Sequence, residues 1–98
     1  MGLDCADLPP LEAGRIDPRE WFANPGAPLE IEIGCGKGTF LLQQATMRAE
    51  VNYIGFEWAG EFYRYSADRI RRHELANVRI VHADAVEFIR WRCADAVA

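Results

Sequence analysis

The segment that most limits how this chain can fold is residues 29–38, Leu-Glu-Ile-Glu-Ile-Gly-Cys-Gly-Lys-Gly. Apolar and acidic residues alternate over Leu29–Ile33, which predicts a strand, and Gly34, Gly36 and Gly38 follow at every second position. Since glycine has no side chain, such a turn lets the backbone come within contact distance of a ligand. A strand that ends in closely spaced glycines at a helix start therefore predicts a site for an adenosine-bearing cofactor.

Helical and strand-like patterns alternate after the glycine turn. The expected elements are a helix over 37–48, a strand over 51–57, a helix over 59–74, a strand over 78–82 and a helix over 85–93. Strands that alternate with helices of this length indicate βαβ units and a parallel sheet. The predicted fold class is therefore α/β, a Rossmann-like, doubly wound and mostly parallel sheet, of which this chain holds only the first three strands and helices. The second helix has one packing stripe at helical spacing, made of Ala59, Phe62, Tyr63, Ser66 and Ile70.

The composition divides the chain into two parts. Residues 1–28 are rich in proline, glycine and acids, so we expect an irregular N-terminal extension. Within it, Asp17 as a cap followed by Pro18 predicts one helical turn, and the aromatic residues after it would anchor the extension. Residues 29–98 are expected to be the N-terminal, cofactor-binding half of a domain truncated before strand four. The first strand, central in complete sheets of this class, would then be an edge strand.

The composition and the cysteine spacing exclude only a few classes of function. No apolar run approaches the roughly 20 residues of a membrane span, and no signal peptide is evident. The three cysteines, Cys5, Cys35 and Cys93, are far apart and give neither metal-ligand nor disulfide spacing. We therefore expect no metal site, no membrane association and a reducing, cytoplasmic setting. Cys35 is interpreted as a small residue in a tight turn rather than as a reactive thiol.

Three acids stand at or near strand ends. Glu32, two residues before the glycines, would repel a pyrophosphate and attract an ammonium group, and the G-x-G-x-G spacing differs from the G-x-G-x-x-G of dinucleotide sites. Glu57, about 20 residues later, can accept hydrogen bonds from ribose hydroxyls, which fits NAD equally well. Asp84 can accept from an adenine amino group, although a helix cap is the alternative. Together they favour S-adenosylmethionine, which joins an amino-acid head to adenosine.

Three blocks carry a resemblance to a known family: Glu32–Gly38, Asn52–Glu57 and Asn77–Ala85. They resemble the bacterial tRNA (guanine-N7)-methyltransferases, a family of class I S-adenosylmethionine-dependent enzymes, over most of residues 29–89. The resemblance implies methyl transfer to N7 of a guanine (guanine-46) in tRNA, with tRNA as partner. The cofactor-binding residues it implies are Glu32, Gly34, Gly36, Gly38, Glu57, Asp84 and Ala85.

The resemblance leaves the catalytic residues unassigned. The family's Asp-Pro-Trp segment follows a fourth strand, so guanine recognition is expected beyond residue 98 and this fragment alone is expected to be inactive. Trp58 stands where a smaller aliphatic residue is common. His73 and His82 lack ligand spacing and are interpreted as structural.

Other interpretations stay open. The chain could belong to another class I methyltransferase that acts on a small molecule or protein, or be a non-catalytic module that binds S-adenosylmethionine. A nicotinamide-dependent dehydrogenase is disfavoured by the glycine spacing and Glu32. The basic residues that could hold tRNA phosphates, with a solvated helix face as the alternative, are Lys37, Arg64, Arg69, Arg71 and Arg72.

Overall fold

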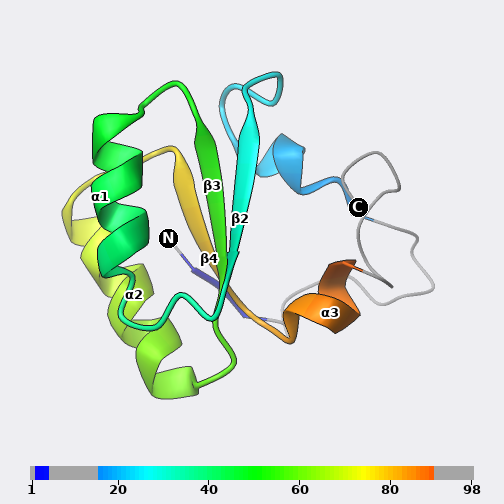
Figure 1. Cartoon of the computed structure of the whole chain (residues 1–98), viewed down its shortest axis with the longest axis vertical. Helices are drawn as coiled ribbons and strands as arrows, with labels where there is room; N and C mark the ends of the chain where they lie inside the picture. Colours follow the sequence, from blue (N-terminus) through cyan, green and yellow to red (C-terminus); the bar gives the residue numbers. More distant parts are fainter. Residues whose placement is uncertain (1, 5–15, 90–98) are drawn as a thin grey trace.

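The computed structural model describes residues 2–4 and 16–89. Within these residues, four parallel strands form one sheet, flanked by helices on both faces (Figure 1). The elements in chain order are β1 (Gly2–Asp4), η3 (Pro18–Trp21), β2 (Leu29–Ile33), α1 (Thr39–Met47), β3 (Asn52–Phe56), α2 (Gly60–Arg72), β4 (Val78–His82) and α3 (Ala85–Glu87). The predicted α/β fold with a parallel sheet is confirmed.

The sheet order is β1-β4-β3-β2, so β2 is an edge strand, as the sequence predicted. In its register with β3, Leu29 lies opposite Asn52 and Ile33 opposite Phe56. Ile33 is 65% exposed, whereas all of β3 is buried between its two neighbours. The open edge therefore leaves an apolar strand incompletely covered.

The strand β1 was not predicted, since three strands were expected and Gly2–Asp4 lies in the segment expected to be irregular. Its backbone pairs in parallel with β4, Gly2 opposite Ile80 and Asp4 opposite His82. Three residues are too few to show an alternating pattern, so only pairing with a distant segment defines this strand.

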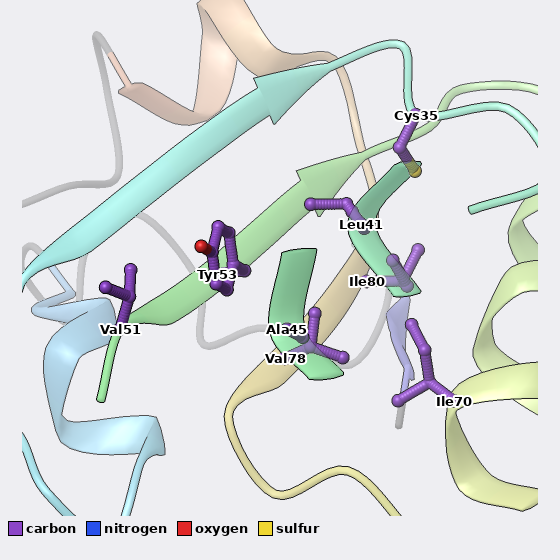
Figure 2. Packing of buried hydrophobic residues seen from close by; sticks show 8 residues of the cluster. All are labelled: Cys35, Leu41, Ala45, Val51, Tyr53, Ile70, Val78 and Ile80. Carbon is purple, nitrogen blue, oxygen red and sulfur yellow. The ribbon is translucent and has the colours of Figure 1, made fainter. Parts of the chain in front are cut away.

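The two faces of the sheet carry separate apolar clusters. On one face, α1 and α2 cover a cluster that includes Leu41, Tyr53 and Ile70 (Figure 2). On the other face, the core residues are Phe22, Ile54, Phe56, Val81, Ala83, Ala85 and Phe88. Trp21 and Leu29 pack against this second cluster, so the aromatic anchoring predicted for the N-terminal segment is found.

The helix boundaries differ from prediction in understandable ways. The first helix begins at Thr39 rather than 37 because Gly38 is its left-handed cap. The described part of the last helix is α3 with Phe88 as its cap, and residues 90–93 lie outside the described residues. Asp17 caps η3 as predicted, accepting from the Arg19 N–H at 3.1 Å.

The predicted stripe of α2 is only partly buried. Ser66 and Ile70 are fully covered and Tyr63 is half-buried, whereas Ala59 and Phe62 are exposed. The first turn of α2 extends past the carboxyl ends of the strands (Figure 1), so no sheet lies beneath it. In the described ranges, no helix has the length and apolar character needed to cross a membrane.

Candidate functional site

A pocket of about 250 Å³ lies at the carboxyl ends of β2, β3 and β4. Its lining residues are Ile33, Gly34, Phe56, Glu57, Trp58, Ala83, Asp84, Ala85 and Val86. Parallel strands present the loops that follow them at this edge, which is where open α/β sheets bind ligands. Four of the residues that the sequence assigned to the cofactor line this pocket: Gly34, Glu57, Asp84 and Ala85.

The glycine loop between β2 and α1 has a conformation that other residues rarely adopt. Gly34, Gly36 and Gly38 have φ values of 72°, 58° and 79°. A Cβ at Gly34 or Gly36 would meet nothing within 4 Å, so both glycines face open space. The loop is thus shaped by backbone torsion and leaves room for a ligand against its main chain.

Gly38 has a different function from the first two glycines. A Cβ at this position would lie 3.1 Å from Cβ of Ser66 in α2. The Ser66 hydroxyl donates a hydrogen bond of 2.5 Å to the Gly36 carbonyl. Helix α2 therefore packs directly on the loop and holds it, a contact that the sequence did not predict for Ser66 beyond its place in the packing stripe.

Glu57, which follows β3, also holds the loop. One carboxylate oxygen, Oε1, accepts a 2.7 Å hydrogen bond from the Gly36 N–H, and Oε2 accepts a 3.0 Å bond from the Ala59 N–H. The Gly34 and Cys35 N–H groups also donate to the Phe56 carbonyl, at 2.8 and 3.1 Å. The acid at the end of β3 is thereby fixed beside the glycine loop.

Glu32 lies on the face of the sheet that α1 and α2 cover and is not part of the pocket lining. Its register partner is Gly55, and alternation along β2 directs Leu29, Ile31 and Ile33 to the opposite face. The Glu32 Oε2 atom is buried and has no hydrogen-bond partner among the described residues. Burial raises the pKa of this carboxyl, since a charge without a partner is poorly tolerated away from water.

Cys35 is buried beneath the loop. Burial, followed by the negative charges of Glu57 and Glu32, raises the pKa of its thiol to about 12. The thiol is thus protonated at physiological pH, because the thiolate is the disfavoured form. The burial of Cys35 agrees with its interpretation as a small residue in a tight turn.

Asp84 lies between β4 and α3, exposed on the rim of the pocket. Its Oδ1 accepts a 3.0 Å hydrogen bond from the Glu87 N–H and caps α3. The cap that the sequence offered as an alternative is therefore present, and it uses one oxygen of a carboxylate that also faces the pocket.

Trp58 lines the pocket and also contacts a pair of stacked rings that lie outside the lining. Trp58 is 64% exposed, and its ring centroid lies 5.6 Å from that of His82. His82 stacks on Tyr63 at 4.9 Å and places Nε2 3.0 Å from the Trp58 carbonyl. These contacts support the structural interpretation of His82. In the described residues, no group of three or more histidine, cysteine or acidic side chains could hold a metal ion.

Comparison with protein families gives one match over most of the chain. The sequence profile of the family described as "Putative methyltransferase" matches residues 26–96. This range contains the glycine loop, both pocket acids and the strands β2, β3 and β4.

Curated relatives match most of this chain. The chain is 37% identical over 70 residues to a tRNA (guanine-N(7)-)-methyltransferase of Myxococcus xanthus, covering 69% of this chain and 34% of the relative. It is 38% identical over 78 residues to the protein of that name in Geobacillus thermodenitrificans, covering 80% and 36%. The chain thus spans about a third of the length of these relatives.

Solved structures share the fold. Coclaurine N-methyltransferase, bound to N-methylheliamine and SAH, superposes with a TM-score of 0.54 and 25% identity over 60% of this chain and 17% of that one. A StiE O-MT structure superposes with a TM-score of 0.56 at 22% identity, over 60% and 22%. The sheet and its flanking helices therefore form part of a class I methyltransferase fold.

Proposed function

The chain belongs to the methyltransferase family whose profile it matches over residues 26–96, and we propose that it is the cofactor-binding part of a tRNA (guanine-N7)-methyltransferase. In this proposal the whole enzyme transfers a methyl group from S-adenosylmethionine to N7 of a guanine in tRNA, in the cytoplasm. The observation that carries the proposal is the 37–38% identity to relatives of that name over 69–80% of this chain.

Features of the site fit this cofactor on physical grounds. Two glycines of the loop face open space, so a ligand can lie directly against the main chain. The buried Oε2 of Glu32 needs a hydrogen-bond donor or a cation. The pocket beside the loop has apolar lining residues, among them Ile33 and Val86, and two acids, Glu57 and Asp84. An amino-acid head near Glu32 and a nucleoside in the pocket would satisfy these features together.

Each acid then has a distinct task. Glu57 accepts hydrogen bonds from the ribose hydroxyls while its carboxylate keeps Gly36 in place. Asp84 accepts from the adenine amino group, and Ala85 follows it at the rim of the pocket. Glu32 attracts the ammonium group. Gly34, Gly36 and Gly38 give the loop the positive φ values that the close approach requires.

The reaction requires this part of the enzyme to bind and orient the cofactor. S-adenosylmethionine supplies a methyl group on a positively charged sulfur. Guanine N7 has a lone pair at the major-groove edge, so it needs no prior deprotonation. The residues of this chain therefore act by holding and orienting the cofactor. We place guanine recognition outside these 98 residues, so we expect the chain to bind cofactor without turnover.

Calorimetry on the 98-residue chain tests the cofactor assignment. We expect S-adenosylmethionine to bind and NAD not to bind. Glu57→Gln should weaken binding about tenfold or more, since hydrogen bonds to a charged group contribute roughly 1.5–3 kcal/mol. Glu61→Gln, which removes an exposed acid from the first turn of α2, is the matched control and should bind as the unaltered chain does. Binding of NAD alone would refute the assignment.

The substrate is tested on the full-length gene product. Methyl transfer to unmodified tRNA, mapped by borohydride–aniline cleavage at N7-methylguanosine, should give one cleaved position. Transfer only to a small molecule or a protein would replace the tRNA assignment and leave the cofactor assignment intact.

A further inference from the structure

Two cations and one aromatic ring gather beside the glycine loop, on the side of α2. The Lys37 Nζ lies 5.8 Å from the centroid of the Tyr65 ring, and the Arg69 guanidinium carbon lies 5.6 Å from it. We call these three residues the basic-aromatic cluster. Tyr65 is 47% exposed and Lys37 is exposed, so the cluster is open to a partner.

The arginine of this cluster is fixed in place. The Arg69 Nη1 donates to the Lys37 carbonyl at 3.3 Å and to the Thr39 hydroxyl at 3.0 Å. Both hydrogen bonds come from one nitrogen, and a guanidinium has five N–H donors. The remaining donors are thus held at a defined position without being used by the described residues.

The charges of the cluster are not neutralised within the described residues, unlike those of the neighbouring arginines. Arg71 and Arg72 both pair with Asp68, at 2.6 and 2.9 Å. Lys37 and Arg69 form no ion pair with any described residue. Two like charges around one ring repel each other, and an anion that binds both of them relieves that repulsion.

We propose that the basic-aromatic cluster of Lys37, Tyr65 and Arg69 binds the phosphodiester backbone of the substrate RNA. The proposal rests on the proposed function, which supplies RNA as the polyanion near the cofactor loop. It also separates four of the five basic residues that the sequence could not rank: Arg69 and Lys37 contact RNA, whereas Arg71 and Arg72 are engaged with Asp68. Tyr65 acts as a positioning residue, because its ring holds both cations.

Fluorescence anisotropy with labelled, unmodified tRNA and the 98-residue chain tests this inference. Each phosphate contact contributes about 0.9 to the slope of log affinity against log salt. Removing one contact should lower that slope by about one and weaken binding about eightfold at 0.1 M salt. We expect this loss for Lys37→Gln and for Arg69→Gln. Arg72→Gln removes the same charge from the same helix and should change binding less than twofold.

The tyrosine variants test positioning. Tyr65→Phe keeps the ring and should bind tRNA as the unaltered chain does, whereas Tyr65→Leu should lose binding. Thermal melts followed by circular dichroism check folding, and Lys37→Gln remains informative if Arg69→Gln unfolds, since the Lys37 side chain is exposed. Calorimetry of S-adenosylmethionine with the unaltered chain, run beside the tRNA titrations, keeps a failure here distinct from a failure of the cofactor assignment.

Three outcomes would overturn the inference. They are absence of tRNA binding by the unaltered chain, equal losses for Arg69→Gln and Arg72→Gln, and displacement of tRNA by polyglutamate at equal charge concentration. The last result would indicate an acidic protein as the partner of the cluster.

Discussion

Gly55 lies where the sheet, helix α1 and the glycine loop meet, and replacing it with alanine tests that arrangement. A Cβ at Gly55 would lie 2.3 Å from Cδ1 of Leu41, 3.0 Å from Sγ of Cys35 and 3.1 Å from its Cβ. Carbon atoms in contact prefer about 3.5–4.0 Å, so Leu41 must move by more than an ångström. Leu41 is 1% exposed and lies within the buried cluster between the sheet and the helices, so its displacement disturbs core packing.

The expected cost follows from these contacts. Overpacking of a core costs roughly 1–3 kcal/mol, and alanine recovers up to about 1 kcal/mol by restricting the unfolded chain. We therefore expect Gly55→Ala to lower the free energy of unfolding by about 2 kcal/mol. Total stability for a chain of this size is about 5–15 kcal/mol, so the loss is easily measured. Displacement of Cys35 should also shift the loop and weaken binding of S-adenosylmethionine.

Urea denaturation followed by tryptophan fluorescence measures the change. With a slope of roughly 1–2 kcal/mol per molar urea, the midpoint should fall by about 1–2 M. Gly26→Ala is the control, because its nearest neighbour would be Asn24 Oδ1 at 3.7 Å. In the double variant with Leu41→Ala the clash is gone, so the two losses should be less than additive. A Gly55→Ala chain as stable as the unaltered one, or strictly additive losses, would refute the packing argument.

Three further predictions concern the loop and its neighbours. Ser66→Ala removes the hydroxyl bond to the Gly36 carbonyl and should cost about 1 kcal/mol of stability by urea denaturation; an unchanged midpoint would contradict this. Because burial and two acids raise the pKa of Cys35 to about 12, iodoacetamide at pH 9 should leave it unmodified in the folded chain and alkylate it in urea, as mass spectrometry of its peptide can show. Burial raises the pKa of Glu32 above its unfolded value. The free energy of unfolding therefore falls as pH rises from the unfolded pKa to the folded pKa. Glu32→Gln should thus be more stable than the unaltered chain at pH 7, lose that advantage below about pH 4, and bind S-adenosylmethionine more weakly; equal stability at both pH values would count against the burial argument.

Local pattern was sufficient for most of the secondary structure. The alternation over Leu29–Ile33 and the apolar run at Val78–His82 correspond to β2 and β4 residue for residue. The cap at Asp17 and the glycine turn were also predicted, because a cap and a positive φ depend on only a few consecutive residues. The edge position of β2 followed from the number of strands.

What the sequence could not give depends on contacts between distant residues. The strand β1 exists through pairing with β4, 78 positions away at Gly2 and Ile80. Only the fold shows that Glu57 accepts from the Gly36 N–H, 21 residues back, and that Ser66 bonds to the same loop.

The sequence assigned Glu32, Glu57 and Asp84 to one cofactor, and their positions in the chain could not show how each side chain is directed. Strand alternation turns Glu32 to the face that α1 and α2 cover, whereas Glu57 and Asp84 line the pocket. Likewise, the sequence presents a row of similar arginines, and only side-chain geometry pairs two of them with Asp68 and leaves Arg69 beside Tyr65. Short-range sterics and periodicity thus determined the elements, while packing between elements decided which side chains became available to a ligand, because burial and pairing are properties of neighbours brought together only in the folded chain.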